Sequence, residues 1–142
     1  MARQIPGCVR NCILATGANA LAKTDKGLLV SVTDAGSYDF GEPAVQKTPT
    51  ADGPLTYGVM YNYDDGAERA AISTDGLMVV KKDENAIAAD VGKRITPSTT
   101  KAGHAAIADA GGFGLVVAIE GTDSPNLFVD LSVPATDTQK AA

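Results

Sequence analysis

Acidic side chains occur as two adjacent pairs, Asp64–Asp65 and Asp83–Glu84, and such pairs often serve as acid–base catalysts. Catalysis requires that both carboxylates reach one substrate. Adjacent residues of a strand point to opposite faces, and both pairs stand beside turn-forming residues, so we interpret them as solvated turns. A calcium loop beginning at Asp64 is disfavoured because the chain becomes apolar at 70–72.

The single histidine, His104, is a candidate general base. No serine or cysteine nucleophile with an orienting carboxylate accompanies it in a catalytic pattern, so we interpret it as a structural residue. The glycine-rich run 111–114 superficially resembles a phosphate-binding loop. Such a loop follows a strand and opens a helix, whereas this run precedes a strand-like segment, so we interpret it as a turn. We therefore predict a protein that is not an enzyme and holds no cofactor.

Cys8 and Cys12 are the only cysteines of the chain. A zinc site needs about four ligands, and His104 is the only other nitrogen or sulfur ligand, so we expect no metal site. A disulfide between them would close a very short loop, which is unfavourable in a reducing compartment. We interpret both as small, partly apolar residues that pack beneath the N-terminal segment or against a partner.

Composition indicates one soluble globular domain. Of 142 residues, 44% are apolar and 20% charged, and only 5% are aromatic, which predicts a core of aliphatic side chains. No apolar run approaches the length of a membrane span. Pro6, Arg10 and Asn11 interrupt the N-terminal apolar residues, so we expect no secretory signal and maturation in a reducing cytoplasm.

The charge is distributed unevenly along the chain. Residues 1–26 hold four basic residues and one acidic residue, whereas the rest is strongly acidic and the net charge is −5. An acidic protein is a poor ligand for nucleic acid. We predict a basic N-terminal arm over 1–26, a β-rich body over 27–134 whose strands begin near Leu28, and a polar tail over 135–142. Because its strands would lie outside the arm, we expect the body to fold without it.

Alternating apolar residues predict the strands of the body. A first strand covers 28–32, and Asp-Gly turns join 57–63, 69–73 and 77–81 into a three-stranded antiparallel meander. In the first strand of this meander, Tyr57, Val59, Tyr61 and Tyr63 are expected on one face.

The remaining segments predict shorter elements. Three prolines between Tyr38 and Pro54 indicate a surface loop with an edge strand at 44–47. Residues 83–91 fit one or two helical turns, and a weak strand is expected at 104–107. The run 114–119 is apolar on both faces and is expected to be central, paired with an alternating strand over 127–133. About seven or eight short, mostly antiparallel strands predict an all-β barrel or sandwich.

The order of several short segments resembles that of a known family. These segments are Gly27-Leu28-Leu29-Val30, Tyr57-Gly58-Val59-Met60, Asp75-Gly76-Leu77-Met78-Val79-Val80, Ala89-Asp90-Val91-Gly92-Lys93-Arg94, Gly114-Leu115-Val116-Val117-Ala118-Ile119-Glu120 and Asn126-Leu127-Phe128-Val129-Asp130-Leu131-Ser132-Val133. From Gly27 to Val133 the chain resembles the capsid decoration, or cement, proteins of tailed bacteriophages. The resemblance rests on element order and turn placement.

The resemblance implies a β-rich virion protein, usually a homotrimer, on the outer surface of an icosahedral head. There it would tie neighbouring subunits of the major capsid protein together. It implies no catalytic residue. The apolar residues of the arm would gain burial on such a partner. The expected contact residues are Ile5, Cys8, Val9, Arg10, Cys12, Ile13, Leu14 and Leu21, with Tyr57, Tyr61 and Tyr63 as a possible subunit interface.

Two other functions remain open from the sequence. The first is a phage receptor-binding or tail-associated adhesion module, which would bind a glycan through the proline-rich loop or the tyrosines. The second is a small enzyme, which lacks support because no polar groups converge.

Overall fold

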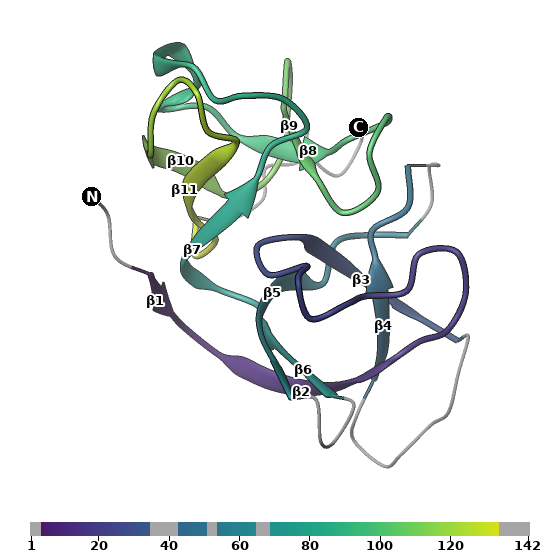
Figure 1. Cartoon of the computed structure of the whole chain (residues 1–142). Coiled ribbons are helices and arrows are strands. Elements are labelled where there is room, and N and C mark those ends of the chain that lie inside the picture. Colours follow the sequence, from purple (N-terminus) through teal and green to yellow (C-terminus); the bar gives the residue numbers. More distant parts are fainter. Residues whose placement is uncertain (1–3, 35–42, 51–53, 65–68, 134–142) are drawn as a thin grey trace.

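A computed structural model describes residues 4–34, 43–50, 54–64 and 69–133 (Figure 1). The described part is nearly all β, with eleven strands and one 3₁₀ turn, so the predicted fold class is confirmed. The elements are β1 (Ile5–Pro6), β2 (Val9–Leu14), β3 (Leu29–Thr33), β4 (Ala44–Lys47), β5 (Gly58–Asp64), β6 (Arg69–Ser73), β7 (Gly76–Lys81), η1 (Ala88–Asp90), β8 (Ile95–Pro97), β9 (Ala105–Ile107), β10 (Leu115–Ile119) and β11 (Asn126–Asp130).

Five strands close into a small barrel in the order β2-β4-β3-β5-β6. Neighbouring strands of the barrel are antiparallel, except that β2 and β4 are parallel. Aliphatic and small side chains dominate its interior, as the low aromatic content predicts. The buried members of this cluster are Cys12, Leu21, Val30, Val45, Met60, Ala70 and Ile72.

A second, four-stranded sheet has the order β1-β7-β11-β10, and the two-stranded β8-β9 ribbon lies near it (Figure 1). Its core contains side chains of both this sheet and the barrel wall, including Leu29, Val59, Met78 and Val129. The first three residues of β3 and of β5 are therefore buried on both faces. Val30 and Met60 face the barrel core, and Leu29 and Val59 pack against the second sheet.

The N-terminal residues join these two parts. Strand β1 pairs with β7, and β2 pairs with β6, both antiparallel. Between them, Gly7 N–H donates to Asp75 O at 3.2 Å and Thr74 N–H donates to Cys8 O at 3.0 Å. Residues 5–14 thus form one continuous N-terminal ribbon along β6 and β7. The expectation that the strands begin near Leu28 is wrong, because β1 and β2 precede it and β2 closes the barrel.

The predicted meander is correct for one of its two turns. Strands β5 and β6 form the expected hairpin. However, β7 leaves the barrel and pairs with β1 and β11. Turn residues predict the pairing of strands that follow each other in the chain. The partners of β7 are instead β1, near the N-terminus, and β11, the last strand.

The predicted roles of the last two strands are exchanged. They pair as expected, but β10 lies at the edge of the sheet and β11 inside it. Accordingly, Leu127, Phe128 and Val129 are all buried, while Val117 of β10 is 41% exposed. Strand β11 ends at Asp130, so the expected extension to Val133 is not formed.

Several shorter predictions can also be compared. The edge strand at 44–47 exists, but β4 lies between β2 and β3 in the closed barrel. The helical segment at 83–91 is reduced to η1, and β9 matches the weak strand. The turn after Asp64, most of the loop over 38–54 and the tail over 135–142 lie outside the described residues.

Candidate functional site

The eight N-terminal residues expected to contact a partner divide into two groups. Ile5, Cys8, Val9 and Arg10 are exposed, with Ile5 62% and Val9 41% exposed. The other four belong to the interior of this chain: Cys12, Ile13 and Leu21 are buried and Leu14 is half-buried. Only the first half of the N-terminal ribbon therefore offers side chains to a partner.

The backbone of this exposed half is well anchored. Cys8 N–H donates to the Asp75 carboxylate, and Thr74 Oγ1 donates to Cys8 O at 3.3 Å. Strand pairing places Val9 opposite Ser73 and Arg10 opposite Ile72. Two aliphatic side chains, a free thiol and a guanidinium are thus presented on a fixed strand. This arrangement suits binding to an apolar surface that carries acidic groups.

The three tyrosines do not share one face. A register shift between Met60 and Asn62 places an extra residue, Tyr61, in β5. A β-bulge of this kind reverses the side on which the following side chains point. Tyr61 consequently packs on the core of the second sheet, and Tyr63, which follows the bulge, packs on the barrel core. Tyr57 also packs on the barrel core, but it precedes both β5 and the bulge. All three rings are half-buried within this chain.

The candidate catalytic groups have structural partners. Asp83 lies in a bend, as expected, but it is half-buried and its Oδ2 accepts a hydrogen bond from Ser98 Oγ at 2.8 Å, so it is only partly solvated. His104 Nδ1 lies 3.1 Å from Ala102 O. Gly111, Gly112 and Gly114 have positive φ and form the turn before β10, as predicted. Within the described ranges, no three metal-ligating side chains cluster.

One carboxylate has a perturbed acidity. Hydrogen bonds from Asn126 and then Ser124 lower the pKa of Glu120 below its ordinary value of 4.5. The acceptor is Glu120 Oε2, which lies 3.0 Å from Ser124 Oγ. The group is fully exposed and belongs to the β10–β11 connection, so we assign it to turn stability.

A second group of exposed apolar residues lies near the outer edge of the second sheet. Ile87 and Val91 flank η1, and Val117 is in the adjacent β10; they are 51%, 45% and 41% exposed. Gly92 N–H donates to Val116 O at 2.7 Å, which holds the two segments together. Sequence reasoning missed this patch because it assigned β10 to the centre of the sheet.

No helix among the described residues is long and apolar enough to span a membrane. Neither the protein-family models nor the curated proteins compared with the chain give a match.

Proposed function

We propose that this chain is a structural virion protein that binds the outside of an icosahedral phage head. It stabilises the capsid by bridging subunits of the major capsid protein. The proposal rests on the resemblance in element order and on one observation in particular. Ile5 and Val9 are exposed on a strand segment whose backbone is fixed by β6 and β7. Exposed aliphatic residues on a rigid strand are typical of a surface that a partner covers.

A binding measurement with purified heads tests this proposal. Heads lacking the protein would be incubated with the wild type, with Ile5→Asp/Val9→Asp, and with the control Leu55→Asp. Leu55 is 86% exposed and lies outside the N-terminal ribbon. Each buried aliphatic side chain contributes about 1.5–3 kcal/mol, so the double variant should bind at least ~10-fold more weakly. Equal binding by the wild type and the double variant would contradict the proposed contact.

We also propose that the protein acts as a homotrimer. The patch formed by Ile87, Val91 and Val117 supports self-association, because assembly removes such residues from water. Sedimentation equilibrium of the wild type should give three times the mass of the chain. Val91→Asp/Val117→Asp should shift the distribution toward monomer. A monomeric wild type, both free and bound to heads, would exclude the trimer.

A further inference from the structure

A hollow of about 430 Å³ lies where the barrel meets the second sheet. Its lining carries three lysines and no carboxylate. The residues that line it are Gln4, Lys23, Thr24, Lys26, Gly27, Met60, Tyr61, Val79, Lys81 and Asn126. We call this hollow the lysine pocket. Its volume lies within the range of about 300–1,000 Å³ that is typical of small-molecule sites.

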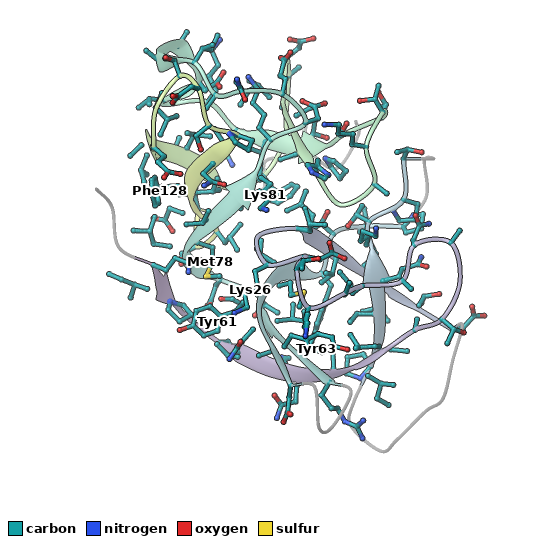
Figure 2. All side chains as sticks on the ribbon, viewed as in Figure 1. Lys26, Tyr61, Tyr63, Met78, Lys81 and Phe128 are labelled. Carbon is teal, nitrogen blue, oxygen red and sulfur yellow. The ribbon has the colours of Figure 1, made fainter. Side chains whose placement is uncertain are left out.

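The floor of the lysine pocket is held by main-chain hydrogen bonds between the two parts of the fold. Gly27 N–H donates to Met60 O in β5, and Lys81 N–H in β7 donates to Gly27 O, both at 2.9 Å. Gly27 has φ of +89°, a conformation that favours glycine. Figure 2 shows Lys26 and Tyr61 beside this junction and Lys81 farther along β7. Lys26 and Lys81 thus extend from backbone segments that these hydrogen bonds hold in place.

Two of the three lysines in the lining, Lys26 and Lys81, have no carboxylate partner in the described part of the chain. Two carboxylates close to the lining are oriented by neutral donors. Asp25 accepts the Ala22 N–H at 2.7 Å, and Glu120 accepts hydrogen bonds from Asn126 and Ser124. Both keep their negative charge, but neither forms an ion pair with Lys26 or Lys81, so an anion that enters can contact both ammonium groups directly.

A neutral donor completes the lining. Gln4 Oε1 accepts the Val79 N–H at 3.0 Å, which orients the amide. Its Nε2 therefore remains as a donor, and in the described part of the chain it has no partner. The lysine pocket thus offers the amide of Gln4 and the ammonium groups of Lys26, from the turn before β3, and of Lys81, from β7. Phosphate and carboxylate oxygens are the acceptors that such donors bind best.

We propose that the lysine pocket binds a small polyanion that carries two or more phosphate or carboxylate groups. Lys26 and Lys81 hold separate groups of the ligand, because Lys26 extends from the turn at Gly27 and Lys81 from β7. This site is independent of the N-terminal ribbon, and it requires no partner protein.

Calorimetric titration of the purified protein with tripolyphosphate and with citrate tests the proposal. The variant Lys26→Gln/Lys81→Gln removes two charges from the pocket. The control Lys93→Gln/Lys101→Gln removes two charges from exposed lysines elsewhere. Charge-assisted hydrogen bonds contribute about 1.5–3 kcal/mol each, so the pocket variant should bind at least ~10-fold more weakly. The control should stay within about twofold of the wild type, since exposed, distant charges are screened.

Two further measurements locate the site and identify its ligand. Saturation with either anion should shift the amide resonances of Gly27 and Lys81. It should also raise the wild-type Tm, and at equal concentration the anion that binds more tightly should raise it more. Tighter binding of tripolyphosphate identifies a phosphate site, and tighter binding of citrate identifies a carboxylate site. Absence of saturable binding to the wild type, or an equal loss in both double variants, would overturn the proposal.

Discussion

Lys82 and Asp90 form an ion pair that is almost fully removed from solvent. Lys82 Nζ lies 3.0 Å from Asp90 Oδ2, and the two side chains are 5% and 3% exposed. The same oxygen accepts the Ile87 N–H at 3.0 Å, so the pair fixes the segment that carries the second apolar patch. Glu84 is farther from Lys82, at 3.6 Å, and is mostly exposed.

Asp90→Asn should destabilise the protein by about 3–5 kcal/mol, because it leaves the buried Lys82 ammonium without its closest counter-charge. The asparagine oxygen can still accept the Ile87 N–H, so the lost stability measures the removal of the negative charge of Asp90. Adding Lys82→Met should recover part of the stability, since no charge then remains buried. Urea unfolding measures both variants. A double variant at least as unstable as Asp90→Asn would contradict this account.

The Glu120 carboxyl gives a prediction on pH. Its pKa is lowered in the folded state by Asn126 and Ser124, so its contribution to stability is present above the unfolded pKa. That contribution is lost as the pH falls through the folded pKa. Asn126→Ala should therefore raise the pKa of Glu120 toward 4.5, as measured by an NMR titration of its side-chain carboxyl carbon. An unchanged pKa would show that Asn126 is not the main cause.

At the scale of single residues, the sequence predicts which residues form turns better than it predicts which side chains are buried. The turn formed by Gly111, Gly112 and Gly114, all with positive φ, was predictable because glycine adopts this conformation readily. The burial of Lys82 and Asp90 was not predictable, because charged residues are usually exposed and nothing in their spacing distinguishes this pair. The lysine pocket was also missed, since Lys26 and Lys81 meet only through the packing of two sheets.

The N-terminal ribbon is the element on which the fold depends most. Strand β2 pairs with both β4 and β6, so deleting residues 1–14 would open the barrel and expose two strand edges. We expect this deletion to abolish cooperative unfolding and amide protection in β4 and β6, as seen by hydrogen exchange. Val9→Ser/Arg10→Ser, which keeps the backbone pairing, should retain both. A cooperatively folded deletion variant would show that the barrel does not need β2.

Strand β5 depends on a glycine at its start. A Cβ on Gly58 would lie 2.5 Å from Ser73 O and 2.7 Å from Ile72 Cγ2, so an alanine there must displace β6. Gly58→Ala should cost about 1–3 kcal/mol, as overpacking does. Gly121→Ala is the matched control, because its nearest described atom is a side-chain oxygen at 3.3 Å. Equal unfolding free energies for the two variants would contradict the close β5–β6 approach.

Elements joined by short turns were predictable, and distant pairings were not. Turn residues and the alternation of apolar with polar residues predicted that β5 pairs with β6 and that β10 pairs with β11, and both pairings are formed. The pairing of β1 with β7 and of β2 with β6 joins segments more than fifty residues apart. The polar and glycine residues in 1–26 concealed β2, whose exposed half carries Arg10 and Asn11. Charge alone therefore suggested a detached arm where the chain forms a barrel strand.

At the scale of the whole molecule, a closed barrel packs against an open sheet through β3 and β5, and the N-terminal ribbon joins the two (Figure 1). This construction leaves the outer half of the ribbon and the patch near η1 as separate apolar surfaces. Two such surfaces on a small protein suit simultaneous contact with a shell and with further copies of the chain. The proposed role needs no chemistry, because a protein that binds only the assembled shell stabilises it by mass action.

The most direct test of this role compares heads with and without the protein. Decorated and stripped heads would be heated at low and at high salt, and the release of DNA would be recorded with a dye. At about 100 times Kd, binding adds ~2.7 kcal/mol per site, so decorated heads should release DNA at a higher temperature. Part of that difference should persist at high salt, because Ile5 and Val9 make apolar contacts. Release at the same temperature from both kinds of head would contradict a stabilising role.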